Sequence, residues 1–304
     1  MYEFIKNNVE TSDKIFLDAP NRNPLSFNEL HQKLEKVRNN FDNLSINRSD
    51  PVAIVLPNGP DLGFLFIACS CFAISAPLNP NYSKNEFKFY LSDLKAKFLI
   101  VDPDLKTEAS KAAFELGITI INLSFERDIG SLKLTKNNGD SFIKTINYYE
   151  NDTSLLLHTS GTTSKPKLVQ LSSNNLIKSS LNIGKTLYLN EEDSCLNIMP
   201  LFHIHGLVAV LLTSLVYNIK LVCTSGFNAL NFYKFLQDFK PSWYSGVPTM
   251  HQAILQRSKN NQDIIRNSPL RFIRSSSAPM PKPVLLEIEK TFNCPVIEAY
   301  GMTE

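Results

Sequence analysis

The sequence predicts an α/β protein built on mostly parallel, doubly wound sheets. Along most of the chain, short apolar stretches that suit buried strands alternate with longer stretches of helical periodicity. Two of the expected helices begin with a capping box, in which Ser26 precedes Glu29 and Ser83 precedes Glu86. The 304 residues are enough for about two domains, or for one large α/β unit with a sizeable core.

The first half of the chain opens with polar residues and one expected helix at 27–41. A strand at 52–56 follows, and it is apolar on both faces, as in a parallel sheet that is covered on both sides. Residues 132–149 show no clear pattern beyond a turn at 136–140. We expect further strands at 97–101 and 118–123, and helices at 60–73, 84–94 and 108–116.

The second half continues the alternation of strands and helices to the last residues. Ligands of open α/β sheets bind beyond the carboxyl ends of the strands, so polar segments that follow strands are the candidate site. Helices are expected after Ser172 or Ser173, near His205, after Pro248 and at 283–292. The expected strands lie at 155–157, 169–171, 195–199, 220–223, 243–245, 272–273 and 295–300.

The charge balance excludes partners that need a broad basic surface. Lys and Arg total 31 and Asp and Glu total 29, which gives a formal net charge of +2. We therefore expect no binding to nucleic acid, and any anion site must be local. The apolar stretches 62–78 and 206–217 fall short of the roughly 20 uninterrupted apolar residues of a spanning helix, so we interpret them as buried helices and expect no transmembrane segment.

The cysteines indicate a reducing compartment. They lie mostly within or beside apolar segments, form no Cys-x-x-Cys pair and follow no signal peptide. We expect buried free thiols and a cytoplasmic protein; a peroxisomal location would need a targeting signal beyond residue 304. The five residues are Cys69, Cys71, Cys195, Cys223 and Cys294.

One segment has the composition of a phosphate-binding loop. After the apolar run at 155–157 come small hydroxyl residues, one glycine, and lysines on both sides of Pro166. Backbone N–H groups, hydroxyls and ammonium groups together suit a polyphosphate, although a polar surface loop would explain the same residues separately. Pro166 stands where the common P-loop needs its second glycine, which argues against a P-loop kinase. The segment is Thr159-Ser160-Gly161-Thr162-Thr163-Ser164-Lys165-Pro166-Lys167.

Three more polar clusters follow expected strands, and together with the loop they point to one crevice. Four clusters at strand ends are a stronger signal than any single one. The three further clusters are Pro200-Leu201-Phe202-His203-Ile204-His205-Gly206, Arg274-Ser275-Ser276-Ser277-Ala278-Pro279 and Glu298-Ala299-Tyr300-Gly301-Met302-Thr303-Glu304.

In this order, the motifs at 159–167, 200–206 and 300–304 resemble those of the adenylate-forming superfamily of acyl-CoA synthetases, luciferases and peptide-synthetase adenylation domains. The stretches 200–206, 243–252 and 271–275 are most similar to the oxalyl-CoA synthetase (oxalate–CoA ligase) branch, as is Ser164, where most of the superfamily has glycine. The resemblance covers nearly the whole chain.

The resemblance implies that residues 1–304 form an AMP-binding N-terminal region, with one doubly wound subdomain at 51–190 and a second at 1–50 plus 191–304. Members of the superfamily continue with a ribose-binding aspartate, a hinge and a mobile C-terminal lid domain that acts in cis and carries a catalytic lysine. None of these lies within the 304 residues, so we expect this polypeptide alone to be weak or inactive.

The implied activity is that of an ATP-dependent, AMP-forming acid–CoA ligase with a small dicarboxylate such as oxalate as its acid. The carboxylate attacks the α-phosphate of ATP and releases pyrophosphate, and coenzyme A then displaces AMP from the acyl-adenylate. A ligase for a medium-chain, long-chain or aryl acid, and a non-catalytic nucleotide-binding fragment, are the alternatives.

The resemblance also implies roles for single residues. The residues that would hold the β- and γ-phosphates are Thr159, Ser160, Gly161, Thr162, Thr163 and Lys167. Those on the adenine side would be Tyr300, stacked on the base, with Gly301, Met302, Ser276, Ser277 and Ala278. Thr303 would bond the α-phosphate and Glu304 would ligate Mg²⁺. The expected catalytic residues are His203, Lys167, Thr303 and Glu304, and the candidates for binding the acid are His203, His205, Trp243, Arg274 and Ser276.

Several of these residues have a structural alternative. His203 and His205 could be a metal pair or two groups at a helix start, and the motif supplies no third ligand. Trp243 could instead be a core residue, and Arg274 could instead be an ordinary surface residue. We interpret His158 and His251 as structural. Leu168 replaces the glycine that usually follows the loop lysine, so we expect the closure of the loop to differ.

Overall fold

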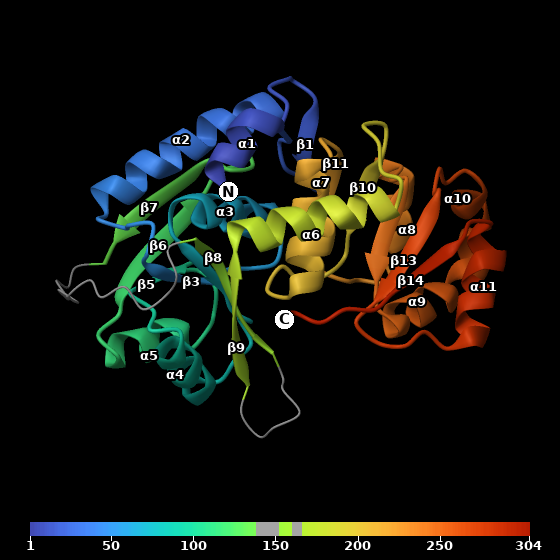
Figure 1. The fold of residues 1–304 in the computed structure, drawn as a ribbon. Helices are drawn as coiled ribbons and strands as arrows, with labels where there is room; N and C mark the ends of the chain where they lie inside the picture. Colours follow the sequence, from blue (N-terminus) through green and yellow to red (C-terminus); the bar gives the residue numbers. More distant parts are fainter. Residues whose placement is uncertain (138–151, 160–165) are drawn as a thin grey trace.

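The computed structural model describes residues 1–137, 152–159 and 166–304, and the strands of these residues form two seven-stranded sheets (Figure 1). Most neighbouring strands in both sheets are parallel, which confirms the predicted fold class. Strands and helices alternate along the chain, as the pattern of apolar stretches indicated.

The first sheet has the strand order β7-β6-β5-β3-β4-β8-β9. Its antiparallel pairs, β6 with β7 and β8 with β9, lie at its two edges. The strands are β3 (Pro51–Val55), β4 (Ile74–Pro77), β5 (Phe98–Val101), β6 (Thr119–Phe125), β7 (Leu132–Lys136), β8 (Thr153–Thr159) and β9 (Lys167–Ser172). The helices before and within this part are α1 (Tyr2–Asn8), α2 (Phe27–Asn43), α3 (Pro60–Phe72), α4 (Lys84–Asp93) and α5 (Ala109–Glu115).

The second sheet has the order β14-β13-β12-β10-β11-β1-β2. The strands β1 and β2 at one edge of this sheet come from the start of the chain, and β1 pairs with β11. Segments that precede and follow the first sheet in the sequence therefore fold together. The strands are β1 (Ile15–Asp18), β2 (Leu25–Ser26), β10 (Ser194–Asn197), β11 (Lys220–Cys223), β12 (Trp243–Gly246), β13 (Phe272–Ser276) and β14 (Val296–Ala299). The helices are α6 (Ser173–Thr186), η1 (His205–Leu212), α7 (Thr213–Val216), α8 (Phe232–Phe239), α9 (Pro248–Leu255), η2 (Ser258–Asn261), α10 (Gln262–Arg266) and α11 (Lys282–Phe292).

The two sheets share one central core, and each has an outer core of its own. Side chains alternate between the faces of a strand. Val52 of β3 and Trp243 of β12 both belong to the central cluster, whereas Ala53 packs with α4 and α5 and Tyr244 packs with α8 and α9. The central cluster also contains residues of α2, α3, η1 and α7. The layers are therefore helix, sheet, helix, sheet, helix.

Two helices of the central layer are apolar on all sides. Nearly every residue of α3 and all residues of η1 are buried, as expected for helices that are enclosed in a large core. The interpretation of 62–78 and 206–217 as buried helices is confirmed for most of their length, but Ile74–Pro77 forms the buried strand β4. In the described part of the chain, no helix combines the length and the apolarity needed to cross a membrane.

The expected helix starts are confirmed, but four strands were not predicted. Ser26 and Ser83 each form a capping box, and Ser172 forms a third with Asn175. Strands β1, β2, β4 and β7 lie in segments for which we predicted no strand. The helix near His205 begins there as expected, but its first eight residues are π-helical, a form that is often found at functional sites.

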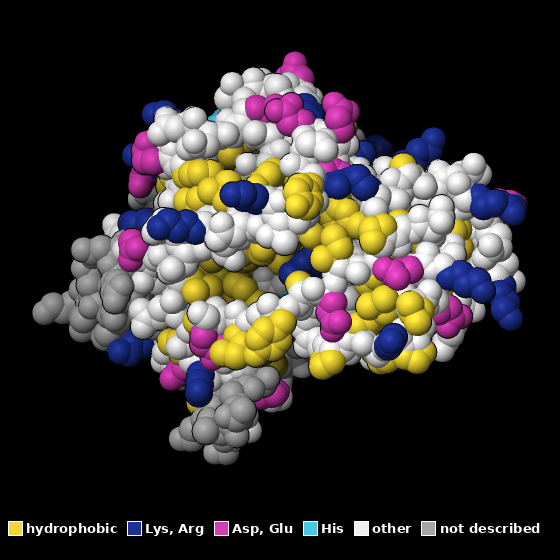
Figure 2. Space-filling view, turned by 45° about the vertical axis from the view of Figure 1, so that its right-hand side comes forward, with side chains coloured by type: hydrophobic (Ala, Val, Ile, Leu, Met, Phe, Trp, Pro, Cys, Tyr) yellow, Lys and Arg dark blue, Asp and Glu magenta, His cyan; other side chains and the backbone are white. Residues whose placement is uncertain are grey.

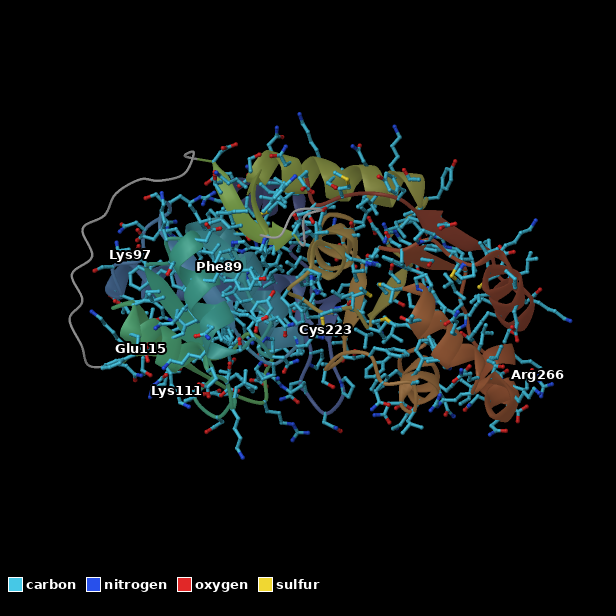
Figure 3. The ribbon with its side chains drawn as sticks, turned by 90° about the horizontal axis from the view of Figure 1, so that it is seen from below. Phe89, Lys97, Lys111, Glu115, Cys223 and Arg266 are labelled. Carbon is cyan, nitrogen blue, oxygen red and sulfur yellow. The ribbon has the colours of Figure 1, made fainter. Side chains whose placement is uncertain are left out.

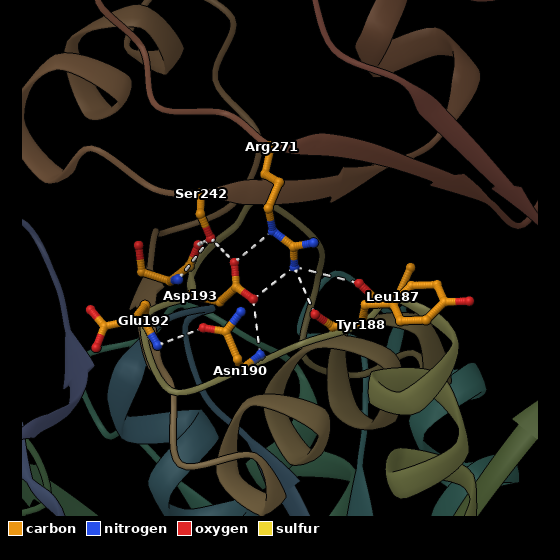
Figure 4. Close-up of polar contacts among 8 residues, drawn as sticks. Leu187, Tyr188, Asn190, Glu192, Asp193, Ser242 and Arg271 are labelled. Atoms are coloured by element: carbon orange, nitrogen blue, oxygen red, sulfur yellow. Dashed lines mark hydrogen bonds and ion pairs between the residues drawn. The ribbon is translucent and has the colours of Figure 1, made fainter.

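A buried carboxylate ties the end of α6 to the second sheet (Figure 4). Asp193 accepts hydrogen bonds from Nε and Nη2 of Arg271 at 3.1 and 2.7 Å, and from Oγ of Ser242 at 2.6 Å. The same Nη2 donates to the carbonyl oxygens of Leu187 and Tyr188 at 3.4 and 3.2 Å. Loop 187–193 is therefore fixed against the amino ends of β12 and β13.

Candidate active site

The register of β12 and β13 places two polar side chains side by side. Trp243 pairs with Phe272 and, two residues further on, Ser245 pairs with Arg274. Since side chains two residues apart share a face, all four lie on the central face of the sheet. The rings of Trp243 and Phe272 stack at 5.4 Å, and Ser245 and Arg274 follow this stack at the carboxyl end of the strands.

The π-helix η1 brings His205 to the same place. His205 is its first residue and is 5% exposed. The next residue must be glycine, because a Cβ on Gly206 would lie 2.4 Å from the carbonyl oxygen of Pro200. The glycine of the 200–206 motif thus lets the preceding loop pack against the start of η1.

His205, Arg274, Ser245 and Ser277 form one hydrogen-bonded network. Nη1 of Arg274 donates to Nε2 of His205 at 3.1 Å and to Oγ of Ser245 at 3.2 Å. Nε2 of His205 also lies 2.7 Å from Oγ of Ser245, and Nδ1 lies 3.0 Å from Oγ of Ser277. A guanidinium can only donate, so Nε2 must be the unprotonated nitrogen and Nδ1 carries the proton.

The electrostatics agree with a neutral imidazole beside a cation. Burial and the charge of Arg274 lower the pKa of His205 to about 3. Arg274 is 7% exposed, and burial lowers its pKa to about 10, which still leaves it charged at neutral pH. Among the described residues no carboxylate pairs with this guanidinium, and only its Nη1 makes hydrogen bonds. A buried cation in this state suits an anionic ligand.

A second buried pair supports the strand ends from the other face. The hydroxyl of Tyr244 lies 3.2 Å from Nδ1 of His251, which is fully buried on α9. A Cβ on Gly246 would lie 3.2 Å from the ring of His251, so the imidazole packs directly against the last residue of β12. Burial lowers the pKa of His251 to about 4, and it too is neutral.

The network opens into a cavity of about 480 Å³ between α6, η1, β13, β14 and the last residues of the chain. Figure 2 shows that hydrophobic side chains gather over the middle of one face of the molecule. The lining residues that the sequence had singled out are His205, Arg274, Ser276, Ser277, Tyr300, Gly301 and Met302. The structure therefore brings most acid-binding and adenine-side candidates to one cavity.

The adenine-side candidates form the rim of this cavity. Oγ of Ser276 donates to the carbonyl oxygen of Ala299 at 3.0 Å and so ties the ends of β13 and β14 together. Ser277 has a φ of 73°, a left-handed conformation that is rare for a residue other than glycine. Ala278 is exposed, and the ring of Tyr300 is 95% exposed, so its face is free to stack on a base.

The phosphate loop spans a hairpin between β8 and β9. Thr159 and Lys167 are direct cross-strand partners at its base, and the ammonium of Lys167 is exposed. Ser160, Gly161, Thr162 and Thr163 lie outside the described residues. Oγ1 of Thr159 donates to Oε1 of Glu304 at 3.5 Å, so the end of the chain reaches the base of the loop (Figure 1). Thr303 precedes it and is half-buried.

The strand beneath the loop is held by an aromatic cluster. Nε2 of His158 lies 2.9 Å from a carboxylate oxygen of Asp93, and its ring meets that of Tyr90 edge-on at 4.7 Å. Burial lowers the pKa of His158, and hydrogen bonding to Asp93 opposes this shift. Leu168 lies opposite His158 in β9 and packs on the outer core, so in this chain the position after Lys167 is an ordinary strand residue.

Two substrate candidates lie away from the cavity. His203 is exposed, its ring packs on Phe202 at 4.7 Å, and it does not line the cavity. Trp243 is fully buried in the central core beneath the network, which contradicts a direct contact with the acid. The histidines do not form a metal pair, because both nitrogens of His205 are engaged within the protein, and the described residues contain no cluster of three or more His, Cys, Asp or Glu.

The cavity wall that α6 contributes and the role of Ser245 were not predicted from the sequence. Ser179, Asn182, Ile183 and Thr186 line the cavity, and their spacing of three and four residues places them on one face of α6. That spacing was a usable signal. No comparable signal in the sequence pointed to Ser245, because a single serine near the end of an apolar strand does not reveal its neighbour in the next strand.

Comparisons with known proteins agree with this geometry. A family model described as AMP-binding enzyme matches residues 4–304. The chain is 37% identical over 300 residues to an oxalate–CoA ligase of Arabidopsis thaliana, covering 96% of this chain and 58% of that protein. It is 37% identical over 289 residues to a probable CoA ligase, CCL9, of Humulus lupulus, covering 91% of this chain and 55% of that protein. The chain thus spans somewhat more than half the length of these relatives.

A solved structure supports the same relationship. The o-succinylbenzoate coenzyme A synthetase of Bacillus subtilis, in complex with AMP, superposes with a TM-score of 0.78 at 26% identity, over 97% of this chain and 57% of that one. The two sheets, the motifs at their carboxyl ends and a family model that spans almost every residue lead to one conclusion: this chain belongs to the family of AMP-binding enzymes.

Proposed function

We propose that this chain forms the ATP- and acid-binding part of an AMP-forming acid–CoA ligase, and that its acid is a small dicarboxylate such as oxalate. The observation that carries the proposal is the buried guanidinium of Arg274, which faces the cavity without a carboxylate partner among the described residues. An oxalate–CoA ligase among the relatives supports the same choice of acid.

The size of the cavity favours a short acid. At about 480 Å³ it falls within the usual range for ligand sites, roughly 300–1,000 Å³. Part of this space is bordered by the adenine-side residues 276–278 and 300–302, so little remains for an acyl group. Arg274 closes the inner end, where a second carboxylate could accept from its remaining N–H groups.

The nucleotide would lie along the carboxyl edges of both sheets. The adenine would stack on the exposed ring of Tyr300, while the triphosphate would extend toward the β8–β9 hairpin. There Thr159 and Lys167, with the loop residues Ser160, Gly161, Thr162 and Thr163, supply hydroxyls, backbone N–H groups and an ammonium for the phosphates. Thr303 would donate to the α-phosphate.

The adenylation step needs alignment more than covalent help from the protein. A carboxylate oxygen of the acid forms a bond to the α-phosphorus, and the bond between this phosphorus and the oxygen bridging to the β-phosphate breaks. The electron pair leaves with pyrophosphate, whose charge the loop donors stabilise. Arg274 would hold the second carboxylate of the acid and so align the reacting carboxylate with the α-phosphorus.

Glu304 fits the expected magnesium ligand. Its carboxylate lies close to the loop, 3.5 Å from the Thr159 hydroxyl, and Mg²⁺ prefers carboxylate and phosphate oxygens. When bound there, the ion would neutralise phosphate charge. The coenzyme A step would depend on the C-terminal domain that the superfamily resemblance implies.

Exchange of labelled pyrophosphate into ATP tests the proposal on the complete protein that contains this chain. Oxalate should support exchange, and acetate and octanoate should support far less. Exchange with octanoate or benzoate but not with oxalate would leave a ligase with a different acid and reject the dicarboxylate. Nucleotide binding without exchange for any acid would reject the enzyme in favour of a nucleotide-binding protein.

A further inference from the structure

We propose that His205 is a positioning residue that couples the acid subsite to the nucleotide subsite: one ring nitrogen orients Arg274 and the other holds Ser277. This inference rests on the proposed function, because it assigns Arg274 to the acid and residues 276–278 to the nucleotide. It concerns a residue that touches neither substrate in this account.

The two ring nitrogens of His205 have different partners, both at the carboxyl end of β13. Nε2 accepts from Nη1 of Arg274 at 3.1 Å, and Nδ1 donates to Oγ of Ser277 at 3.0 Å. The tautomer follows from the guanidinium, which has no lone pair to offer. Because the ring is rigid, a shift of one partner must move the other.

The acid side of this link is the orientation of the guanidinium. Nη1 is held by His205 and Ser245, so the edge with Nη2 and Nε is the one left for a ligand. A guanidinium binds a carboxylate best through two parallel hydrogen bonds, which require a fixed plane. Without its acceptor on His205, Arg274 would keep its charge but lose that orientation.

The nucleotide side is the backbone at the end of β13. Ser277 has a φ of 73°, a costly conformation for serine, and it is followed by the exposed Ala278. The hydrogen bond from Nδ1 favours this conformation, since the side chain of Ser277 is otherwise exposed. Ser277 and its neighbour Ser276 line the cavity next to Tyr300, so their backbone helps to shape the adenine side.

Two substitutions separate the two halves of the link. In His205→Gln the amide oxygen can reach the position of Nε2 and accept from Arg274, but the donor to Ser277 is lost. In His205→Asn an amide N–H stands near the position of Nδ1 and can donate to Ser277, but the acceptor for Arg274 is lost. Both variants remove the same ring, so a merely structural role would affect them alike.

The experiment measures KM for ATP and for oxalate in the exchange reaction of the complete protein. His205→Gln should raise the KM for ATP about fivefold to tenfold and change that for oxalate little. His205→Asn should show the reverse. Equal shifts of both constants in both variants would overturn the coupling, whereas absence of exchange in the wild-type protein would instead reject the proposed function.

Ser277 offers a second test, and its measurement in the wild-type background does not depend on the His205 variants, because the Ser277 side chain is exposed. Ser277→Ala removes only the acceptor of the Nδ1 proton. It should raise the KM for ATP in the wild-type background and add nothing in the His205→Gln background. An additive effect, or no effect of Ser277→Ala on the wild type, would contradict the link.

Discussion

Nη1 of Arg274 lies 3.1 Å from the acceptor nitrogen of His205, although 69 residues separate them in the chain. The contact joins a strand of the second sheet to the first residue of the π-helix in the central layer. It fixes a buried cation in one orientation, at the edge of the sheet where ligands of this fold bind. The function that we propose depends on this arrangement.

Removal of the loop ammonium should slow adenylation. Lys167→Ala takes one cation from the phosphate side, and we expect the exchange rate to fall at least tenfold, about 1.4 kcal/mol in activation free energy. Lys111→Ala is the matched control, because Lys111 is an exposed lysine on α5 at the margin of the first half of the molecule (Figure 3). An unchanged rate in Lys167→Ala would remove this residue from the mechanism.

The buried ion pair at the end of α6 should matter for stability far more than an exposed one. Asp193→Ala leaves the guanidinium of Arg271 and the hydroxyl of Ser242 without their acceptor, and we expect it to lower the free energy of unfolding by about 2–4 kcal/mol. Asp263→Ala breaks the exposed pair with Arg266 and should cost less than about 1 kcal/mol. Chemical denaturation compares the two, and similar losses would argue against a role for burial.

Gly206 should tolerate no side chain. A Cβ there would meet the carbonyl oxygen of Pro200 at 2.4 Å, so Gly206→Ala must move backbone, and we expect a loss of at least about 2 kcal/mol. Gly63→Ala is the control: its Cβ would meet only side-chain atoms, the nearest at 3.4 Å. Thermal unfolding of both variants checks the prediction, which an unchanged midpoint for Gly206→Ala would refute.

The buried histidines should make stability depend on pH. Burial lowers the pKa of His205 to about 3 and that of His251 to about 4, from 6.5. At a pH between the folded-state pKa values and 6.5, the unfolded chain binds protons that the folded chain does not. The free energy of unfolding therefore falls as the pH drops from 6.5 toward 4. The slope of the free energy of unfolding from these two histidines approaches about 3 kcal/mol per pH unit.

Urea denaturation at a series of pH values across this window measures that slope. His251→Gln should reduce the contribution of the pair by half, because only His205 then remains to exclude a proton. A slope that is identical in the wild type and in this variant would contradict the prediction for His251.

The fold could be predicted from the sequence for most strands that are buried on both faces. β3 is an uninterrupted apolar run, and α3 after it is too apolar for a surface helix. The strands that escaped prediction are short or lie at a sheet edge: β2 has two residues, β1 and β4 have four each, and β7 is largely exposed. For β7 the alternation of Leu132 and Leu134 with lysine and threonine was a signal that could have been used.

The candidate site could be predicted only in part, because motifs name residues but not their neighbours. His205 and Arg274 were both candidates, yet their contact depends on the order β10-β12-β13, which local patterns do not encode. Trp243 was also a candidate, but it lies in the core and not at the site. Its strand has one face toward the central core, and only the residue at the strand end, Ser245, reaches the site.

The role of Arg274 as the receptor of a second carboxylate is tested most directly by Arg274→Met, measured as kcat/KM for oxalate and for acetate in the exchange reaction. Methionine keeps much of the length and fills the buried site without a charge. Arg266→Ala is the control, since Arg266 is an exposed arginine at the outer end of the second half (Figure 3). We expect kcat/KM for oxalate to fall about a hundredfold relative to that for acetate. Equal falls for both acids, or no fall for oxalate, would contradict the account.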